Sequence, residues 1–221
     1  MKVKMKGQIF LIIAIIFVLF LILLRNGLSL AEILENQKTL EENLDRLEFD
    51  NIRSELPNAI TVSFNDSINM TNNTVNFTQF VQQVEQAKGL TFKSFSVQTS
   101  HGNVTVSSNT VLNVTAFNLL GEQISFLNIT FGNSTPAPQQ TFSNIPDNQT
   151  RFTTFTFNTA ATINYTMYVS WNTTTRNISE SFTIPVEIAR SKYVAFFDLQ
   201  LIGKMSTHRD KFVETDIIRK Q

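Results

Sequence analysis

The sequence predicts a mainly β protein: an antiparallel, immunoglobulin-like β-sandwich preceded by an N-terminal transmembrane helix and a juxtamembrane helix. Three observations support this class. Residues 9–24 form an unbroken apolar run, residues 26–55 carry charged side chains with regularly spaced leucines, and from residue 58 onward apolar and polar side chains alternate with period two. We therefore expect three segments, which are 1–25, 26–55 and 56–221, and we expect the last to fold on its own.

Composition excludes several classes of protein. The chain of 221 residues has 18 basic and 18 acidic side chains and no cysteine. Balanced charge gives no field that would attract nucleic acid, and a chain without cysteine forms no disulfides or thiolate metal sites. Residues 56–187 hold only ten charged side chains, well below the usual fraction of about a quarter. This composition is what we expect of a secreted domain covered by hydroxyls, amides and glycans, which does not need charge for solubility.

The apolar run is sixteen residues long, and as a helix it would span about 25 Å with its flanks, near the lower limit for crossing a bilayer. Three lysines precede the run and one arginine follows it closely, at Lys2, Lys4, Lys6 and Arg25. The positive-inside rule then places the N-terminus in the cytoplasm and residues 26–221 outside. We expect a single-pass protein of the cell membrane with the lipid bilayer as its partner.

Three fates of this segment are open. It is an uncleaved signal anchor, a secretory signal peptide, or a leader that is cut on the cytoplasmic side. The secretory interpretation rests on the small residues Ser29 and Ala31, which would make Glu32 the new N-terminus. The third interpretation rests on Gly7 and Gln8, which stand directly before the apolar run.

The arrangement Lys6-Gly7-Gln8 before an apolar helix resembles the class III signal peptides of archaeal type IV pilin-like proteins. The resemblance covers the first 24 residues and the layout of an apolar helix followed by a β-domain. It implies that a prepilin peptidase cuts between Gly7 and Gln8, that the helix stays on the mature chain, and that the chain is a minor pilin-like subunit. Phe10 and Ile12 depart from the serine and glutamate that many such pilins carry there.

A second helix is expected over residues 26–55. Asn26-Gly27 is a break signal, and Ser29 and Glu32 have the spacing of a capping box. Five apolar side chains then follow heptad spacing, at Leu30, Ile33, Leu40, Leu44 and Leu47. Two interpretations are open: the stripe joins copies of the chain by self-association of the N-terminal helices, or it packs on the β-domain.

The β-domain is expected to contain ten strands with short turns between them. The predicted strands are Ala59 to Phe64, Leu90 to Gln98, Asn103 to Ser107, Val111 to Phe117, Gln123 to Phe131, Arg151 to Phe157, Thr162 to Trp171, Ser179 to Ile188, Tyr193 to Ile202 and Lys211 to Ile217. One short helix near residues 78–88 interrupts them. Gly203-Lys204 predicts a hairpin turn between the last two strands.

The β-domain is rich in N-x-S/T sequons, the acceptor motif for N-glycans. Twelve are present, at Asn65, Asn69, Asn72, Asn76, Asn103, Asn113, Asn128, Asn133, Asn148, Asn164, Asn172 and Asn177. Random placement of the 18 asparagines and 36 serines and threonines of residues 56–187 would give about five. None of the four asparagines in residues 26–55 is in a sequon. The excess therefore lies in the domain that the topology places outside the cell.

Strand geometry gives a second argument, because Asn at i and Ser or Thr at i+2 share one face of a strand while the middle residue points to the other. In seven sequons the middle residue is large and apolar, at Met70, Phe77, Val104, Val114, Ile129, Tyr165 and Ile178. We therefore expect the middle residue in the core and the acceptor amide in solvent.

No catalytic, metal or cofactor site is predicted. His101 and His208 have no metal-ligand spacing and are expected at the surface. Asp198 and Asp210 are expected to be a strand residue and a turn charge, and no GxSxG elbow or glycine-rich phosphate loop is present. We expect a protein that is not an enzyme.

Two functions fit these patterns: a membrane-anchored, N-glycosylated cell-surface structural protein, or an adhesin or ligand-binding sandwich on a membrane-anchored stalk. A concave aromatic or acidic patch on one sandwich face would favour binding. A smooth Asn/Thr face together with an exposed apolar helix would favour the structural role.

Overall fold

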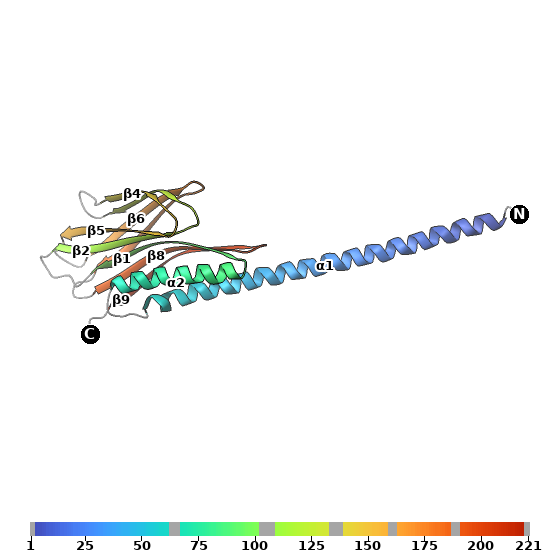
Figure 1. Cartoon of the computed structure of the whole chain (residues 1–221), viewed down its shortest axis with the longest axis horizontal. Helices are drawn as coiled ribbons and strands as arrows, with labels where there is room; N and C mark the ends of the chain where they lie inside the picture. The colour runs from blue at the N-terminus through green and yellow to red at the C-terminus, as the bar shows by residue number, and fades with distance from the viewer. Residues whose placement is uncertain are drawn as a thin grey trace. The chain divides into compact units, whose positions relative to one another are not determined.

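The computed structural model describes the backbone over residues 3–61, 67–101, 109–132, 139–158, 163–186 and 191–218, and it describes side chains over most of these ranges. The chain divides into two compact units, Met1–Asp45 and Arg46–Gln221. The second unit contains the last turns of the first helix, a second helix and all of the strands described (Figure 1). Its start lies before the predicted segment boundary at residue 56.

Helix α1 runs without a break from Val3 to Thr61. The juxtamembrane helix predicted over residues 26–55 is therefore confirmed as part of α1, whereas the predicted break at Asn26-Gly27 and the predicted helix start at Ser29 are wrong. A glycine inside a helix costs about 1 kcal/mol relative to alanine. Gly27 is surrounded by good helix formers, among them several leucines, Arg25 and Ala31, and their helix propensity outweighs the local break signal. The predicted strand from residue 59 is also wrong over the part that is described, because residues 59–61 form the end of α1.

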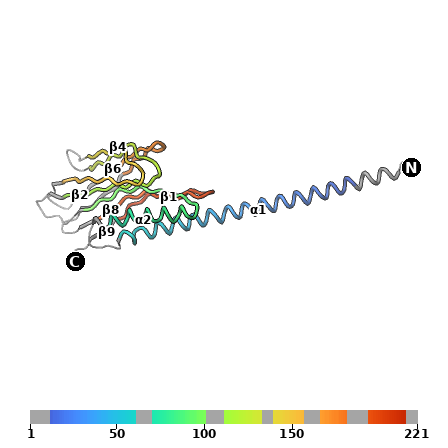
Figure 2. The backbone as a smooth tube through the Cα atoms, in the orientation of Figure 1, coloured from blue at the N-terminus to red at the C-terminus, as the bar shows by residue number. Residues whose placement is uncertain are grey.

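The described part of α1 holds the candidate membrane span that the sequence predicts, by its length and composition (Figure 2). Every side chain from Ile12 to Leu40 is exposed. Large contiguous apolar patches are rare on water-soluble monomers. The N-terminal apolar helix is thus confirmed as an element that nothing else in its own unit covers.

Helix α2 spans Ser67–Ala87, which is longer than the short helix predicted near residues 78–88. Its buried side chains recur at a spacing of three to four residues, at Met70, Thr74, Thr78, Val81 and Glu85. Three of these five are polar, so the helical period is hidden from a search for apolar residues. The helix ends at Gly89, whose φ of 80° suits a glycine, and Leu90 N donates to Glu85 O at 2.9 Å to close a Schellman motif.

Nine strands form two antiparallel sheets among the residues described. The five-stranded sheet has the order β5-β2-β1-β8-β9, with β1 at Thr91–His101, β2 at Asn109–Leu119, β5 at Gln149–Asn158, β8 at Ser191–Ile202 and β9 at Thr207–Ile218. The four-stranded sheet has the order β4-β3-β6-β7, with β3 at Ile124–Phe131, β4 at Gln139–Ile145, β6 at Ile163–Thr173 and β7 at Asn177–Val186. The mainly β class and its antiparallel sheets are confirmed.

The strand prediction also missed one strand that the structure describes. Strand β4 was not predicted, because it is an edge strand of mostly polar residues whose apolar members are Phe142 and Ile145. The strand predicted over residues 103–107 lies outside the described residues. The predicted hairpin turn at Gly203 is confirmed, since Gly203 N donates to Ser206 O at 2.9 Å.

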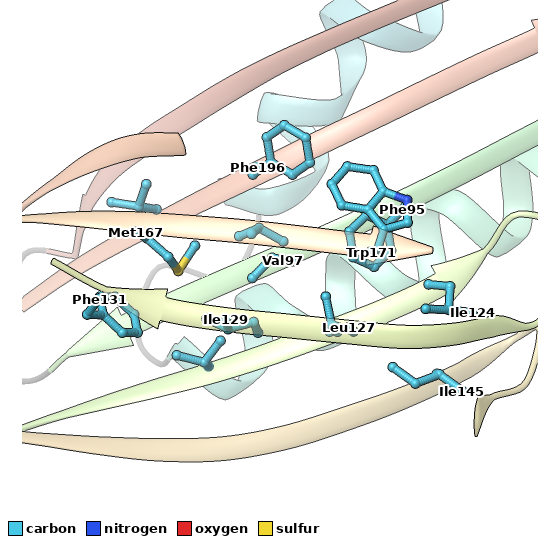
Figure 3. Packing of buried hydrophobic residues seen from close by; sticks show 14 of the residues in the cluster. Phe95, Val97, Ile124, Leu127, Ile129, Phe131, Ile145, Met167, Trp171 and Phe196 are labelled. Carbon is cyan, nitrogen blue, oxygen red and sulfur yellow. The ribbon is translucent and has the colours of Figure 1, made fainter. Parts of the chain in front are cut away.

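One core fills the space between the two sheets. Figure 3 shows side chains of β3 and β6 facing those of β1 and β8. Trp171 of β6 lies at its centre, with ring centroids 4.5 Å from Phe95 and 5.8 Å from Phe196. This core is the sandwich that the alternating pattern predicts.

A second core lies between the other face of the five-stranded sheet and the helices. Helix α2 contributes Met70 and Val81, and the last turns of α1 contribute four buried side chains, at Phe49, Ile52, Leu56 and Ile60. They pack on aromatic and aliphatic residues of β1, β2 and β8. The folded unit therefore has three layers, which are helices, five-stranded sheet and four-stranded sheet.

Candidate glycan-acceptor sites

The outer face of the four-stranded sheet carries three sequons whose acceptor side chains are described, and they lie on adjacent strands. Asn128 of β3 stands opposite Ser170 of β6, and Asn172 of β6 stands opposite Asn177 of β7. Asn177 is exposed, and Asn128 and Asn172 are half-buried. Alternate residues of the same strands, such as Trp171, point into the core between the sheets. Because α2 lies against the other sheet (Figure 1), this face remains open to solvent.

The middle residue of a strand sequon does point to the core, as the alternation predicts. Val114 of β2 and Ile129 of β3 are fully buried, and Ile178 of β7 packs partly buried against the core between the sheets. The acceptor amides beside them are therefore directed away from that core.

Asn128 shows the local geometry of a strand sequon. Its Nδ2 donates to Thr130 Oγ1 at 3.3 Å, and its Oδ1 accepts a hydrogen bond from Thr141 Oγ1 of β4 at 3.3 Å. The amide and the hydroxyl of one sequon thus lie side by side on the solvent face of the strand. This is the juxtaposition that the motif requires.

The hydroxyl of the Asn172 sequon belongs to a polar cluster at one end of the sandwich. Thr174 Oγ1 donates to Glu122 Oε2 at 3.0 Å, and Thr175 Oγ1 donates to Glu122 Oε1 at 2.9 Å. Partial burial raises the pKa of Glu122, but these hydrogen bonds and the charge of Arg176 outweigh it, so the pKa lies below its ordinary value. The carboxylate therefore stays ionised and ties the β6–β7 turn to the loop before β3.

Asn148 occupies a turn between β4 and β5. Its φ is 57°, in the left-handed region that asparagine tolerates better than most residues. Its Oδ1 accepts a hydrogen bond from Gln79 Nε2 of α2 at 2.7 Å. This contact does not involve Asn148 Nδ2, the atom to which a glycan would be attached. Both Asn148 and Thr150 are exposed. Among the described acceptors it is one of the most accessible.

Three sequons lie on helix α2, at Asn69, Asn72 and Asn76, and the strand argument does not apply to them. On a helix, residues i and i+2 are about 200° apart, so an exposed asparagine has its threonine on the opposite side. Asn72 and Asn76 are exposed, whereas Thr74 and Thr78 are 0% and 2% exposed. Both hydroxyls donate to the carbonyl four residues earlier, at 2.9 Å. Thr74 and Thr78 are thus part of the buried face of α2, which the sequence pattern did not reveal.

Five acceptors are not described in full. Asn65, Asn103 and Asn133 lie outside the described residues, and the side chains of Asn69 and Asn164 are not described although their backbones lie in α2 and β6. The predicted leader cut between Gly7 and Gln8 falls within α1, where the side chains are likewise not described.

A buried polar network holds α2 to the five-stranded sheet. Tyr193 Oη of β8 donates to Gln98 Oε1 at 2.8 Å and lies 3.2 Å from Thr74 Oγ1. Burial raises the pKa of Tyr193 far above its ordinary value. Burial thus favours the protonated phenol, which donates the hydrogen bond to Gln98.

A charged cluster joins the two helices at the end of α2. Lys88 Nζ donates to Glu48 Oε1 of α1 at 2.6 Å and to Glu85 Oε1 at 2.8 Å. The hydrogen bond from Lys88 lowers the pKa of Glu48, while burial raises that of Glu85. The lysine therefore bridges one ionised carboxylate and one that resists ionisation.

The two aspartates and two histidines considered in the sequence analysis lie in strands, and three of them contact other side chains of the folded unit. Asp198 is buried in β8 and accepts two hydrogen bonds from Arg209. Asp210 lies in β9 and pairs with Arg53 of α1 at 2.7 Å, so its prediction as a turn charge is wrong. His208 is half-buried against the Phe49 ring, with centroids 6.1 Å apart, instead of lying at the surface as predicted. His101 ends β1, and its side chain is not described.

No group of three potential metal ligands occurs within the parts of the chain whose side chains are described. No protein-family model, curated protein or solved structure matches the chain. Its function must therefore be inferred from its own residues.

Proposed function

We propose that this chain is a membrane-anchored, N-glycosylated structural protein of the cell surface. The observation that carries the proposal is the exposure of α1. Its side chains from Ile12 to Leu40 are exposed, including the long apolar run, while its last turns are buried in the folded unit. A bilayer is the environment that accepts such an apolar helix.

The charge distribution supports an orientation with residues 26–221 outside the cell, as the lysines before the apolar run predict. The sequons of the β-domain support the same orientation, because N-glycans are attached to the parts of a protein that lie outside the cytoplasm. Asn128, Asn172 and Asn177 share one open face that carries few charges and many hydroxyls and amides. Attached glycans would give this face its solubility.

The second apolar stripe on α1 supports a pilin-like role with self-association. Leu40 and Leu44 are 63% exposed within the first unit, and Leu47 is 60% exposed within the folded unit, so these leucines offer an apolar stripe for self-association. At about 100° per residue, the buried stripe that begins at Phe49 lies on roughly the opposite side of the helix. A helix with one face in its own core and another apolar face free is suited to bind a second copy.

We propose that the sandwich is a variant of the immunoglobulin fold. Constant-type immunoglobulin domains place strands A, B, E and D in one sheet and C, F and G in the other. Strands β1, β2 and β5 are neighbours in the order A-B-E, and β3, β6 and β7 in the order C-F-G. Strand β4 joins beside β3, and the β8–β9 hairpin extends the first sheet beyond β1. Backbone contacts across β2–β5 and β3–β6, measured by NMR, would test this order.

The structural role is favoured over an adhesin by the character of the open sheet face. Asn, Ser and Thr dominate it, and its aromatic residues Phe126 and Tyr168 stand apart on β3 and β6. Tyr168 lies over Gly132, where a Cβ would meet its ring at 3.1 Å, so its contact is intramolecular. A smooth amide and hydroxyl face together with an exposed apolar helix fits the structural alternative.

The proposal is tested on protein extracted from the membranes of its own host. N-terminal sequencing distinguishes Met1 for a signal anchor, Gln8 for a pilin-like subunit and Glu32 for a secreted protein. Intact-mass measurement tests the glycans at the same time. A chain that starts at Glu32, or one with the mass of the bare polypeptide, would contradict the anchored glycoprotein.

Glycopeptide mapping tests the acceptors one by one. The transferase must reach both the amide and the hydroxyl of a sequon. We therefore expect Asn148 and Asn177 to be occupied and Asn72 and Asn76 to be largely bare, because the helix hydroxyls are buried. Equal occupancy at all four would show that modification precedes folding and would refute this order.

A further inference from the structure

A groove of about 370 Å³ runs between α2 and the β2–β5 edge of the five-stranded sheet. Helix α2 covers the middle of this sheet but leaves the edge strand β5 open. Asn72 and Val75 form one wall, and Asn113, Thr115 and Phe152 form the other. The volume is at the lower end of the range for sites that hold small organic groups.

The groove has the chemistry of a surface for sugars. Among the described residues that line it, none is charged; they combine hydroxyls and amides, including those of Ser100 and Thr150, with the ring of Phe152. Phe152 is 61% exposed, which is unusual for a phenylalanine in a soluble domain. Sugar rings present hydroxyls at their edges and C–H groups on their faces, so they match donors and acceptors around one aromatic face.

The strand register places an acceptor asparagine inside this groove. Thr115 stands opposite Phe152, and Asn113 stands opposite Thr154, so all four point to the helix side of the sheet. Asn113 is therefore the diagonal neighbour of Phe152, at the separation of about 7–8 Å across which an aromatic side chain can reach. Both members of the Asn113 sequon line the groove and are half-buried instead of buried.

The other acceptor that lines the groove is less suited. Asn72 has its hydroxyl partner Thr74 fully buried beneath α2. Of the two described acceptors that line the groove, Asn113 is thus the one whose amide and hydroxyl can both be reached in the folded chain.

We propose that this groove seats the inner sugars of a glycan attached to Asn113, with Phe152 as the stacking wall. This inference rests on the proposed glycosylation of the β-domain. The glycan would connect β2, β5 and the α2 wall, and it would cover the exposed Phe152 ring. It would then be part of the folded structure and not only a solubilising group.

A double-mutant cycle on full-length protein from the native host tests this. Four chains are compared by thermal unfolding in detergent: wild type, Phe152→Ala, Asn113→Gln and the double variant. Occupancy of Asn113 is measured by glycopeptide mass spectrometry in each. Phe126→Ala is the matched control, because Phe126 is 40% exposed on the other sheet, two residues from the Asn128 sequon.

We expect Phe152→Ala to lower the thermal midpoint by about 2–4 °C when Asn113 carries its glycan and to have no effect in the Asn113→Gln background. Phe126→Ala should have the same effect in both backgrounds. As a second measurement, mild periodate should oxidise the Asn113 sugars more slowly in the native wild type than after unfolding. Phe152→Ala should abolish that protection.

The two proposals fail in different ways. If Asn113 is occupied but Phe152→Ala has the same effect in both backgrounds and the sugars are unprotected, the groove assignment is overturned and the glycoprotein stands. If Asn113 is bare while other sequons are modified, the groove assignment is again overturned alone. If every sequon is bare, both proposals fall.

Discussion

The last turns of α1 are part of the folded unit, so the position at which the chain is truncated should decide whether it folds. A chain that starts at Arg46 keeps Phe49 and Ile52, which are 5% and 6% exposed. A chain that starts at Leu56 loses both. It also loses Arg53, which pairs with Asp210 and lies over the Phe212 ring at 5.2 Å.

The loss can be estimated from core substitutions. Removing a buried phenylalanine or isoleucine side chain costs about 2–5 kcal/mol each. The six residues that remain of the helix, 56–61, are too few to stay helical alone, so Leu56 and Ile60 would lose most of their packing as well. The total is on the order of 10 kcal/mol, which equals the whole stability of a typical domain.

Circular dichroism during heating measures the outcome on the two purified fragments. We expect a cooperative transition for the fragment from Arg46 and none for the fragment from Leu56. The sequence alone suggested that the shorter fragment would fold. If both melted cooperatively within about 5 °C of each other, the α1 segment would contribute about 2 kcal/mol or less and the reasoning would be refuted.

Three further predictions follow from single side chains. Tyr193→Phe leaves Gln98 Oε1 without its buried donor, so the free energy of unfolding should fall by about 1–3 kcal/mol in a denaturant titration. Glu122 has a lowered pKa, so its contribution is present above the ordinary value of 4.5 and is lost as the pH falls through the folded-state value. Glu122→Gln should therefore destabilise the chain at pH 7 more than at pH 3, and an equal loss at both would contradict this. Leu44→Asp changes an exposed residue, so the thermal midpoint should hold while chemical cross-linking between copies in membranes decreases. Unchanged cross-linking would remove the stripe as a contact.

Predictions from sequence succeeded where the signal is local and repeated. Strands β3 and β6 follow their alternation, because a strand with one face in a core must place apolar residues at every second position. The apolar run of α1 is equally local, since its length and composition alone make it a candidate span. The phase of strand sequons such as that of Asn128 follows from the same rule.

Predictions failed where a distant part of the chain decides the role of a residue. The buried stripe of α2 includes Thr74, which looks like a solvent-facing sequon residue until Tyr193 packs against it. His208 resembled a surface histidine, but Phe49 lies beside it. In both residues the partner is more than a hundred positions away in the sequence.

The sequence by itself determined the apolar helix, the alternating strands and the number of sequons, because each depends on residue type and spacing within one segment. Only the tertiary structure decided which face of α1 enters the core and which sequons keep their hydroxyls in solvent. It also decided that Asn113 and Phe152 share a groove beside α2. The physical reason is that the burial of a side chain depends on several segments that pack together. The pairing of β2 with β5, for example, cannot be inferred from the sequence of either strand alone.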